Sequence, residues 1–266
     1  MNTANLRQLI DSAHQLEAEN GQLRGLLSGL LGNLHPAIRL PPEDELGVLT
    51  AFVSAYIEQV PDVLDAASSV AEEAGLEAQI KPVLQMAEGF FVQPPALMDG
   101  HYGLESLLDE AYLAHRLVEE VNDLYITHLG QPLIPLDTTI ANLIAHRLIG
   151  EPFANELDEA VHEAMQTLLH PPAFSSPAVD RFSRFPGFDW DDSFEAFHLY
   201  FQKHLQIDYD PGSSITALRV SRLGRTLLLS IQMMINSRRI SHRHRNKLPI
   251  RSEERRVGKE CLRLCR

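Results

Sequence analysis

Two pairs of a carboxylate and an imidazole are the sharpest chemical pattern in the sequence. Each pair has the form Glu-x-x-His, first as Glu159 and His162 and again as Glu195 and His198. A spacing of three residues places both side chains on the same face of a helix. Carboxylate and imidazole ligands together suit iron or manganese. The two pairs therefore predict a metal site, provided that their helices turn them toward each other.

A metal site inside a helical bundle needs more carboxylates than these two pairs supply. The pattern resembles that of ferritin-like carboxylate proteins, in which two such pairs and one glutamate from each of two other helices hold two metal ions. The candidates for the two further glutamates are Glu119 or Glu120, and Glu88 or Glu58. The resemblance implies an oxidase-type enzyme with iron or manganese as its cofactor.

The helix that contains the first pair argues against this site. Its apolar stripe of Phe153, Leu157 and Val161 must face the core, and Glu159 and His162 lie on the opposite side. A metal site in a bundle has to face inward. The ferritin-like arrangement also separates the two pairs by another helix, whereas here they lie on successive helices. The metal enzyme is therefore the alternative hypothesis, and the leading one expects no cofactor.

Other catalytic patterns do not occur in the sequence. It has no Gly-x-Gly-x-x-Gly or Walker-type phosphate loop, no His-Glu-x-x-His and no Gly-x-Ser-x-Gly. Both cysteines lie in the last six residues, at Cys261 and Cys265, so the body offers no thiolate nucleophile and no disulfide framework. These observations favour a non-enzymatic role.

The first 35 residues carry a heptad pattern. Leucine recurs every seventh residue at Leu9, Leu16, Leu23 and Leu30, and a second series three residues earlier holds Leu6, Ala13, Asn20, Leu27 and Leu34. Two such series form the a and d seam of a coiled coil, and an asparagine at an a position fixes the register of a parallel dimer. The seam predicts a helix that self-associates or binds a partner helix through Leu9, Leu16, Asn20, Leu23, Leu27 and Leu30.

The same stripe has a second interpretation. An amphipathic helix that packs on its own body needs a similar row of apolar residues. Four glycines also fall in this stretch, at Gly21, Gly25, Gly29 and Gly32, and each costs about 1 kcal/mol of helix stability relative to alanine. Intermolecular and intramolecular packing therefore both stay open. Pro36 ends the element.

Apolar periodicity predicts that most of the remaining chain is helical. Helices are expected over 43–57, 63–75, 76–91, 104–129, 136–149, 153–168, 192–206 and 213–236. Pro61 separates the first two helices, and Gly75 and Gly150 end the helices that precede them. Asp137 or Thr138 caps the helix expected over 136–149. No alternating strand pattern of useful length is present. The expected fold is an all-α, irregular multi-helix bundle with an N-terminal heptad-patterned helix.

Charge is distributed unevenly along the 266 residues. The net charge is −13, but residues 237–266 hold 11 of the 23 Lys and Arg residues and 3 of the 36 Asp and Glu residues. The remaining chain thus has 12 basic and 33 acidic residues, which disfavours binding to nucleic acid over most of its surface. The basic segment 237–250 is the exception and supports a second alternative, nucleic-acid binding.

The last residues look foreign to the rest of the chain. The string Arg251-Ser-Glu-Glu-Arg-Arg-Val-Gly-Lys-Glu-Cys261 resembles one that recurs at the ends of unrelated protein sequences, and it carries no function. We expect the native chain to continue differently after about Pro249. The expected organisation is an N-terminal helix over 1–35, a helical bundle over 43–236, the basic segment 237–250 and a foreign tail over 251–266.

The sequence favours a non-enzymatic adaptor or regulatory protein that acts through helix–helix interactions. Its partner would be another protein or a second copy of the chain, bound by the N-terminal helix. The N-terminus lacks a basic stretch followed by an apolar run, and no window has the roughly 18 apolar residues of a membrane span. We therefore expect an acidic cytoplasmic protein.

Overall fold

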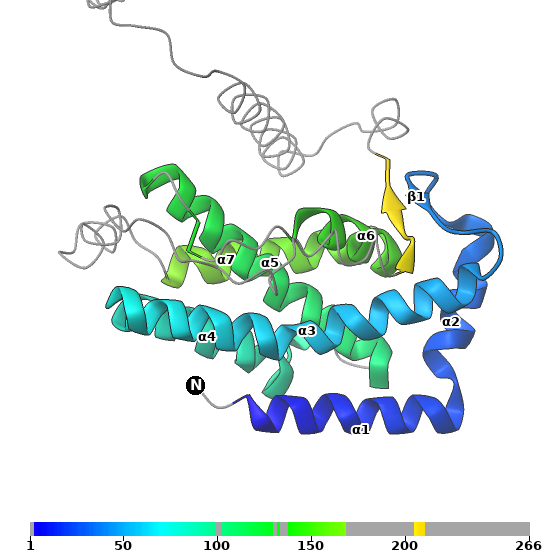
Figure 1. Cartoon of the computed structure of the whole chain (residues 1–266), viewed down its shortest axis with the longest axis horizontal. Helices are drawn as coiled ribbons and strands as arrows, with labels where there is room; N and C mark the ends of the chain where they lie inside the picture. The colour runs from blue at the N-terminus through cyan, green and yellow to red at the C-terminus, as the bar shows by residue number, and fades with distance from the viewer. Residues whose placement is uncertain (1–2, 99–102, 130–131, 134–137, 169–204, 211–266) are drawn as a thin grey trace, which may run out of the picture. The chain divides into compact units, whose positions relative to one another are not determined.

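The computed structural model describes residues 3–98, 103–129, 132–133, 138–168 and 205–210, which all belong to one compact unit, Met1–Ala217. Within these ranges it confirms the expected all-α multi-helix bundle (Figure 1). The α-helices are α1 (Ala4–Asn20), α2 (Gln22–Leu30), α3 (Glu45–Ala74), α4 (Glu77–Val92), α5 (Gly103–Leu129), α6 (Thr139–Ile149) and α7 (Phe153–Leu168). Shorter elements are the 3₁₀ helices η1 (Leu31–Asn33) and η2 (Ala96–Met98) and the strands β1 (Ile38–Arg39) and β2 (Asp208–Tyr209).

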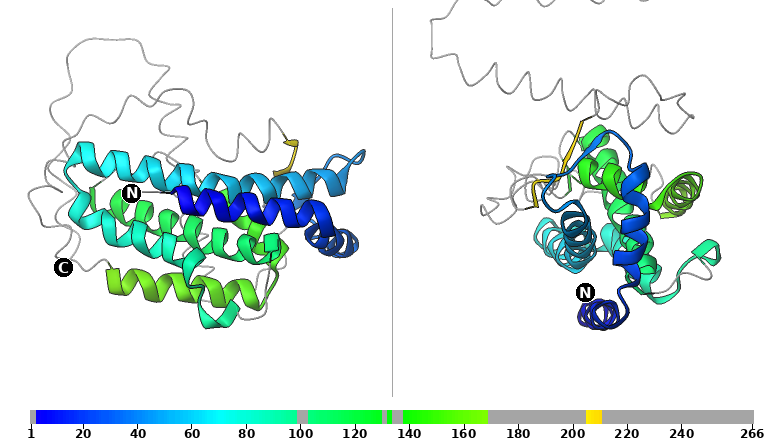
Figure 2. Two further views of the ribbon diagram at one scale, coloured as in Figure 1. Left: turned by 90° about the horizontal axis from the view of Figure 1, so that it is seen from below. Right: turned by 90° about the vertical axis from the view of Figure 1, so that its right-hand side faces the viewer.

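Helix α5 forms the centre of the bundle. It contacts each of the helices α1, α2, α3, α4, α6 and α7. Every side chain from Ser106 to Glu119 is buried, and the views in Figure 2 show the other helices arranged around it. A helix buried on all sides is normally apolar throughout, yet α5 carries charged residues at several of these positions. Those charges must find partners inside the protein.

Helix α3 is continuous through a proline. The break predicted at Pro61 is wrong, because the helix runs from Glu45 to Ala74. A proline inside a helix lacks one backbone donor and opposes continuation. Here Pro61 and its neighbours Val60 and Val63 are all buried. Packing on both sides of the proline therefore holds the helix together despite the missing hydrogen bond.

Helices α1 and α2 replace the single helix expected over 1–35. The chain turns at Gly21, whose φ of 62° lies in the left-handed region that favours glycine. The backbone N–H of Gly21 donates to the carbonyl oxygen of Glu17 at 2.8 Å. The Glu17 carboxylate then accepts from the backbone N–H groups of Leu23 and Arg24, at 2.8 and 3.0 Å. Glu17 thus caps α2 across the corner, and a carboxylate at a helix N-terminus is favoured by the helix dipole.

Both N-terminal helices pack on the body of the same chain. Leu6, Ile10 and Ala13 of α1 and Leu23 and Leu27 of α2 belong to the main hydrophobic core. The intramolecular interpretation therefore describes four residues of the heptad stripe, Leu6, Ala13, Leu23 and Leu27, and Ile10 lies beside that stripe.

Polar pairs add to the attachment of α1 to α3. Arg7 forms ion pairs with Asp62 and Asp65, each at 2.9 Å. His14 lies 3.0 Å from the carboxylate of Glu58. The three acidic residues follow one another at spacings of four and three, so they line the side of α3 that faces α1. Glu58, one of the glutamates considered for a metal site, is used in this contact.

A small antiparallel pair of strands joins two distant parts of the chain. Ile38 lies opposite Tyr209, and Arg39 lies opposite Asp208. The backbone N–H of Asp210 donates to Ala37 at 2.8 Å, and Arg39 also forms an ion pair with Asp210. Strands of two residues carry no readable alternation, which is why sequence periodicity did not reveal them.

The other helix boundaries agree closely with expectation. Gly75 and Gly150 follow α3 and α6 as predicted stops. Helix α6 begins at Thr139, slightly later than expected, and the Thr138 side chain makes no capping hydrogen bond.

The predicted helices at 192–206 and 213–236, the basic segment 237–250 and the tail 251–266 lie outside the described residues, apart from 205–206. Among described helices, none has the length and apolarity to cross a membrane.

The corner at Gly21 gives two glycine substitutions with opposite expected effects. An added Cβ meets nothing within 4 Å at either Gly21 or Gly25, so backbone conformation alone separates the two positions. Gly21→Ala should lower the free energy of unfolding by about 1 kcal/mol, because alanine is disfavoured in the left-handed region. Gly25→Ala, inside α2, should raise it by about 0.5–1 kcal/mol. Chemical denaturation measures both changes. If Gly21→Ala stabilised the protein, the left-handed conformation at Gly21 would be contradicted.

Candidate functional site

The predicted interaction residues divide into a buried group and an exposed group. Leu23 and Leu27 are fully buried, and Leu30 is partly buried against the same core. Leu9 and Leu16 remain 41% and 45% exposed, although Leu6 and Ala13 beside them are buried. We call Leu9 and Leu16 the outer seam. They lie one heptad apart on α1, at the edge of the stripe that faces the core.

Asn20 has a hydrogen-bond partner within its own chain. The residue is exposed, and its side-chain oxygen accepts from the backbone N–H of Gln22 at 3.0 Å. This contact helps α2 to begin directly after the corner. Because the chain turns at Gly21 and Leu23 lies in the core, the heptad seam is interrupted after α1. The surface that remains for an outside helix is the outer seam of α1.

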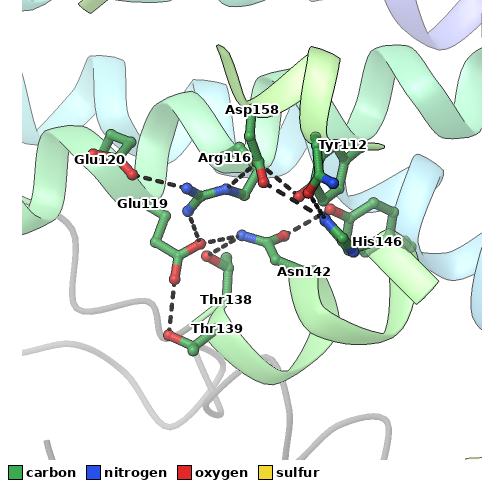
Figure 3. Close-up of polar contacts among 11 residues, drawn as sticks. Tyr112, Arg116, Glu119, Glu120, Thr138, Thr139, Asn142, His146 and Asp158 are labelled. Carbon is green, nitrogen blue, oxygen red and sulfur yellow. Dashed lines mark hydrogen bonds and ion pairs between the residues drawn. The ribbon is translucent and has the colours of Figure 1, made fainter. Parts of the chain in front are cut away.

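A buried cluster of charged residues joins α5 to α7 (Figure 3). Arg116 forms ion pairs with three carboxylates: Glu119 at 2.6 Å, Glu120 at 2.8 Å and Asp158 at 3.0 Å. Glu119 and Glu120 lie three and four residues further along α5, whereas Asp158 belongs to α7. Each of the three guanidinium nitrogens thereby contacts a different carboxylate.

The same cluster extends to α6 and α3 through neutral side chains. Glu119 accepts from Asn142 at 2.5 Å and from Thr139 at 3.0 Å, and both donors belong to α6. Asn142 in turn accepts from the Tyr56 hydroxyl of α3 at 2.6 Å. Tyr112 donates to Asp158 at 2.8 Å. The hydrogen bonds thus connect four helices through one continuous network.

The surroundings fix the charge state of this network. Burial lowers the pKa of Arg116, but Glu119, Tyr112 and Asp158 raise it more, so the guanidinium stays charged. Burial lowers the pKa of His146, whose Nε2 lies 3.2 Å from the side-chain oxygen of Asn155. Each carboxylate is held by donors from the protein itself. The arrangement therefore ties α3, α5, α6 and α7 together.

The candidate metal ligands do not converge among the residues that the structure describes. Glu119 is buried on α5, and both of its oxygens accept hydrogen bonds. Glu159 and His162 are exposed on α7, and His162 lies 2.9 Å from the Gln166 side chain. No group of three or more His, Cys, Asp or Glu residues in the described ranges is placed to hold a metal ion. Glu195 and His198 fall outside those ranges.

Two further titratable groups are buried in α5. Burial lowers the pKa of His115 to about 4, and its Nε2 donates to the Tyr56 carbonyl oxygen at 2.9 Å. Burial raises the pKa of Glu110 to about 7, partly offset by a hydrogen bond from Ser106 at 3.1 Å. The second oxygen of Glu110 has no hydrogen-bond partner among the residues that the structure describes. Burial therefore shifts both groups toward their neutral forms.

Sequence reasoning missed Arg116, Asn142 and Asp158. The signal for part of the network was present, since Arg116, Glu119 and Glu120 have the spacing of ion pairs within one helix. That spacing usually marks a solvated helix face. Only the packing of α5 between six other helices turns it into a buried network.

Arg116 offers a strong test of the network. Arg116→Ala would leave the buried Glu119 and the partly buried Glu120 and Asp158 without their cation, and we expect a loss of about 3–5 kcal/mol in the free energy of unfolding. The matched control is Arg147→Ala, because Arg147 pairs at 2.9 Å with Glu151, an exposed residue of the same chain. That exposed pair should contribute less than about 1 kcal/mol. If urea denaturation gave equal losses of unfolding free energy for the two variants, the large contribution of the Arg116 cluster to stability would be contradicted.

His115 makes stability depend on pH. The unfolded imidazole binds a proton near pH 6.5, whereas the folded one does so only near its pKa of about 4. The unfolded state is therefore favoured as the pH falls from about 6.5 to 4, by about 3 kcal/mol from this group. His115→Gln should flatten that part of the curve of unfolding free energy against pH. The exposed control His162→Gln should leave it unchanged, and an unaltered slope in His115→Gln would refute the assignment.

Comparison with known proteins identifies no relationship for this chain. No protein-family model matches it, and no curated protein and no solved structure does so either. Its function has to be argued from the contacts described above.

Proposed function

We propose that this protein is a non-enzymatic adaptor or regulatory protein that binds another helix along α1. The observation that carries the proposal is the outer seam. Leu9 and Leu16 stay about half exposed at the edge of the side by which α1 is anchored in the core. A pair of leucines one heptad apart is the spacing by which an amphipathic helix recognises a second helix.

The position of α1 supports this role. The helix forms the lower edge of the bundle in Figure 1 and lies in front when the molecule is viewed from below (Figure 2, left). Its inner face is held by Leu6, Ile10 and Ala13 and by the Arg7 ion pairs with α3. A partner can therefore dock on the outer seam without unfolding the helix, which keeps the entropy cost of binding low.

The buried polar residues support a non-catalytic role as well. The side chains in the described part of the chain that look most like an active site are those around Arg116. They are bonded to one another and join α3, α5, α6 and α7. An enzyme site needs groups aimed at a space that a substrate can enter. The structural use of these residues leaves the surface of α1 as the best-supported functional feature.

Site-specific photo-cross-linking tests this function. A photoreactive phenylalanine analogue at Ser12, an exposed residue between the two leucines, should give a discrete covalent adduct in cells that express the chain. The control position is Thr167 on α7, which is exposed and, like Ser12, bonds to the carbonyl four residues earlier. Adding Leu9→Glu and Leu16→Glu should abolish the Ser12 adduct. Adducts of equal yield at both positions, or none at Ser12, would contradict the proposal.

A further inference from the structure

Four exposed residues along the outer edge of α1 are arranged symmetrically about the middle of the helix. An asparagine lies at each end of this line and a leucine lies inside each asparagine, in the order Asn5, Leu9, Leu16 and Asn20, with the exposed Ser12 near the centre. The residue numbers of the asparagine pair and of the leucine pair both add up to 25. A two-fold axis between two identical antiparallel helices imposes this relation, because each residue i of one copy meets residue j of the other.

We propose that the outer seam of α1 binds a second copy of this chain, with the two α1 helices antiparallel. Leu9 of one copy then packs against Leu16 of the other, and each copy contributes both residues. Ser12 lies next to the axis, where a small side chain allows the two backbones to approach closely. Asn5 faces Asn20, whose amide nitrogen is able to donate while its oxygen continues to accept from Gln22.

Charge favours this particular contact between two acidic molecules. The chain carries a net charge of −13, so two copies repel each other over most approaches. The four residues of this line are uncharged, and so are Gln8 and Gln15 on its outer flank. Glu19 is the exposed acidic residue on that flank, and an antiparallel pairing centred near Ser12 places the two copies of Glu19 at opposite ends, about 20 Å apart. Arg7 is turned toward α3, where it is paired with Asp62 and Asp65. Two α1 helices can therefore meet without bringing like charges together.

The length of α1 sets the strength of the contact. Its 17 residues span about 25 Å. One helix face of that length buries less than the roughly 800 Å² per partner of a standard stable interface. We therefore infer a reversible dimer with a dissociation constant on the order of 10⁻⁴ M, which responds to the local concentration of the chain. Such a dimer suits an adaptor that assembles only where it is concentrated.

Sedimentation equilibrium of the purified chain tests the association itself. From about 10 µM to about 1 mM, the weight-average mass should rise from that of a monomer toward that of a dimer. In the variant with Leu9→Gln and Leu16→Gln, the dissociation constant of the dimer should rise at least about tenfold. Leu97→Gln is the matched control, because Leu97 is also exposed but lies in η2. A monomer at every concentration, or an equal effect of Leu97→Gln, would overturn the inference.

Cysteine cross-linking tests the antiparallel orientation. In a background with Cys261→Ser and Cys265→Ser, Leu9→Cys and Leu16→Cys are made as separate variants. Under oxidised glutathione, an equimolar mixture should give the mixed disulfide-linked dimer much faster than either variant alone gives its own dimer. A parallel pair would give the reverse, since it places each residue beside its own copy, and that result would overturn the inference.

This inference rests on the proposed function, and the two can fail separately. A Ser12 photo-adduct that consists of two copies of this chain supports both. A Ser12 adduct with a different protein, together with a monomer at every concentration in sedimentation, overturns the self-pairing and leaves helix binding by α1 in place. The absence of any Ser12 adduct in cells, together with a dimer of the purified chain, supports the self-pairing and contradicts its use in the cell.

Discussion

The charge of Arg116 inside the bundle is the constraint on which the rest of the structure depends. A buried guanidinium is tolerable only if its carboxylate partners hold it at hydrogen-bonding distance, because desolvation of each ion is costly. Asp158 supplies that contact from α7, and Asn142 positions Glu119 from α6. Helix α7 therefore cannot slide along α5 without breaking an ion pair, and α6 cannot do so without breaking the hydrogen bonds to Glu119. An apolar core of the same size would permit several registers, whereas this network specifies one.

The central place of α5 also explains why α1 carries the surface of interest. Helices that surround a buried helix must each direct one apolar side inward. On α1 that side is formed by Leu6, Ile10 and Ala13, which the core needs. The heptad pattern is wider than this requirement, and the two leucines at its edge are left half exposed. One stripe thus supplies residues for folding and, in the proposed function, different residues for recognition.

Much of the fold was predictable from the sequence, because apolar periodicity and glycine stops are local signals. They located α4, α5 and α7 closely. Two errors came from effects of packing on the backbone. Pro61 is held inside α3 by buried neighbours, and Gly21 turns the chain because Glu17 caps the next helix. The site was less predictable. The leucines of the seam were identified, but which of them face outward depends on the position of α3 and α5, and the partners in the Arg116–Asp158 pair are 42 residues apart.

The strand pair formed by Ile38 and Tyr209 has a consequence for synthesis on the ribosome. Arg39 and Asp210 are 171 residues apart, so the first strand leaves the exit tunnel long before its partner exists. At about 5–20 residues per second, the interval is on the order of 10–30 seconds. During that time the helices from α1 to α7 can assemble, while β1 presents an unpaired edge to the solvent or to a chaperone. Closure of this pair is then a late event of translation, and it follows assembly of the helical core.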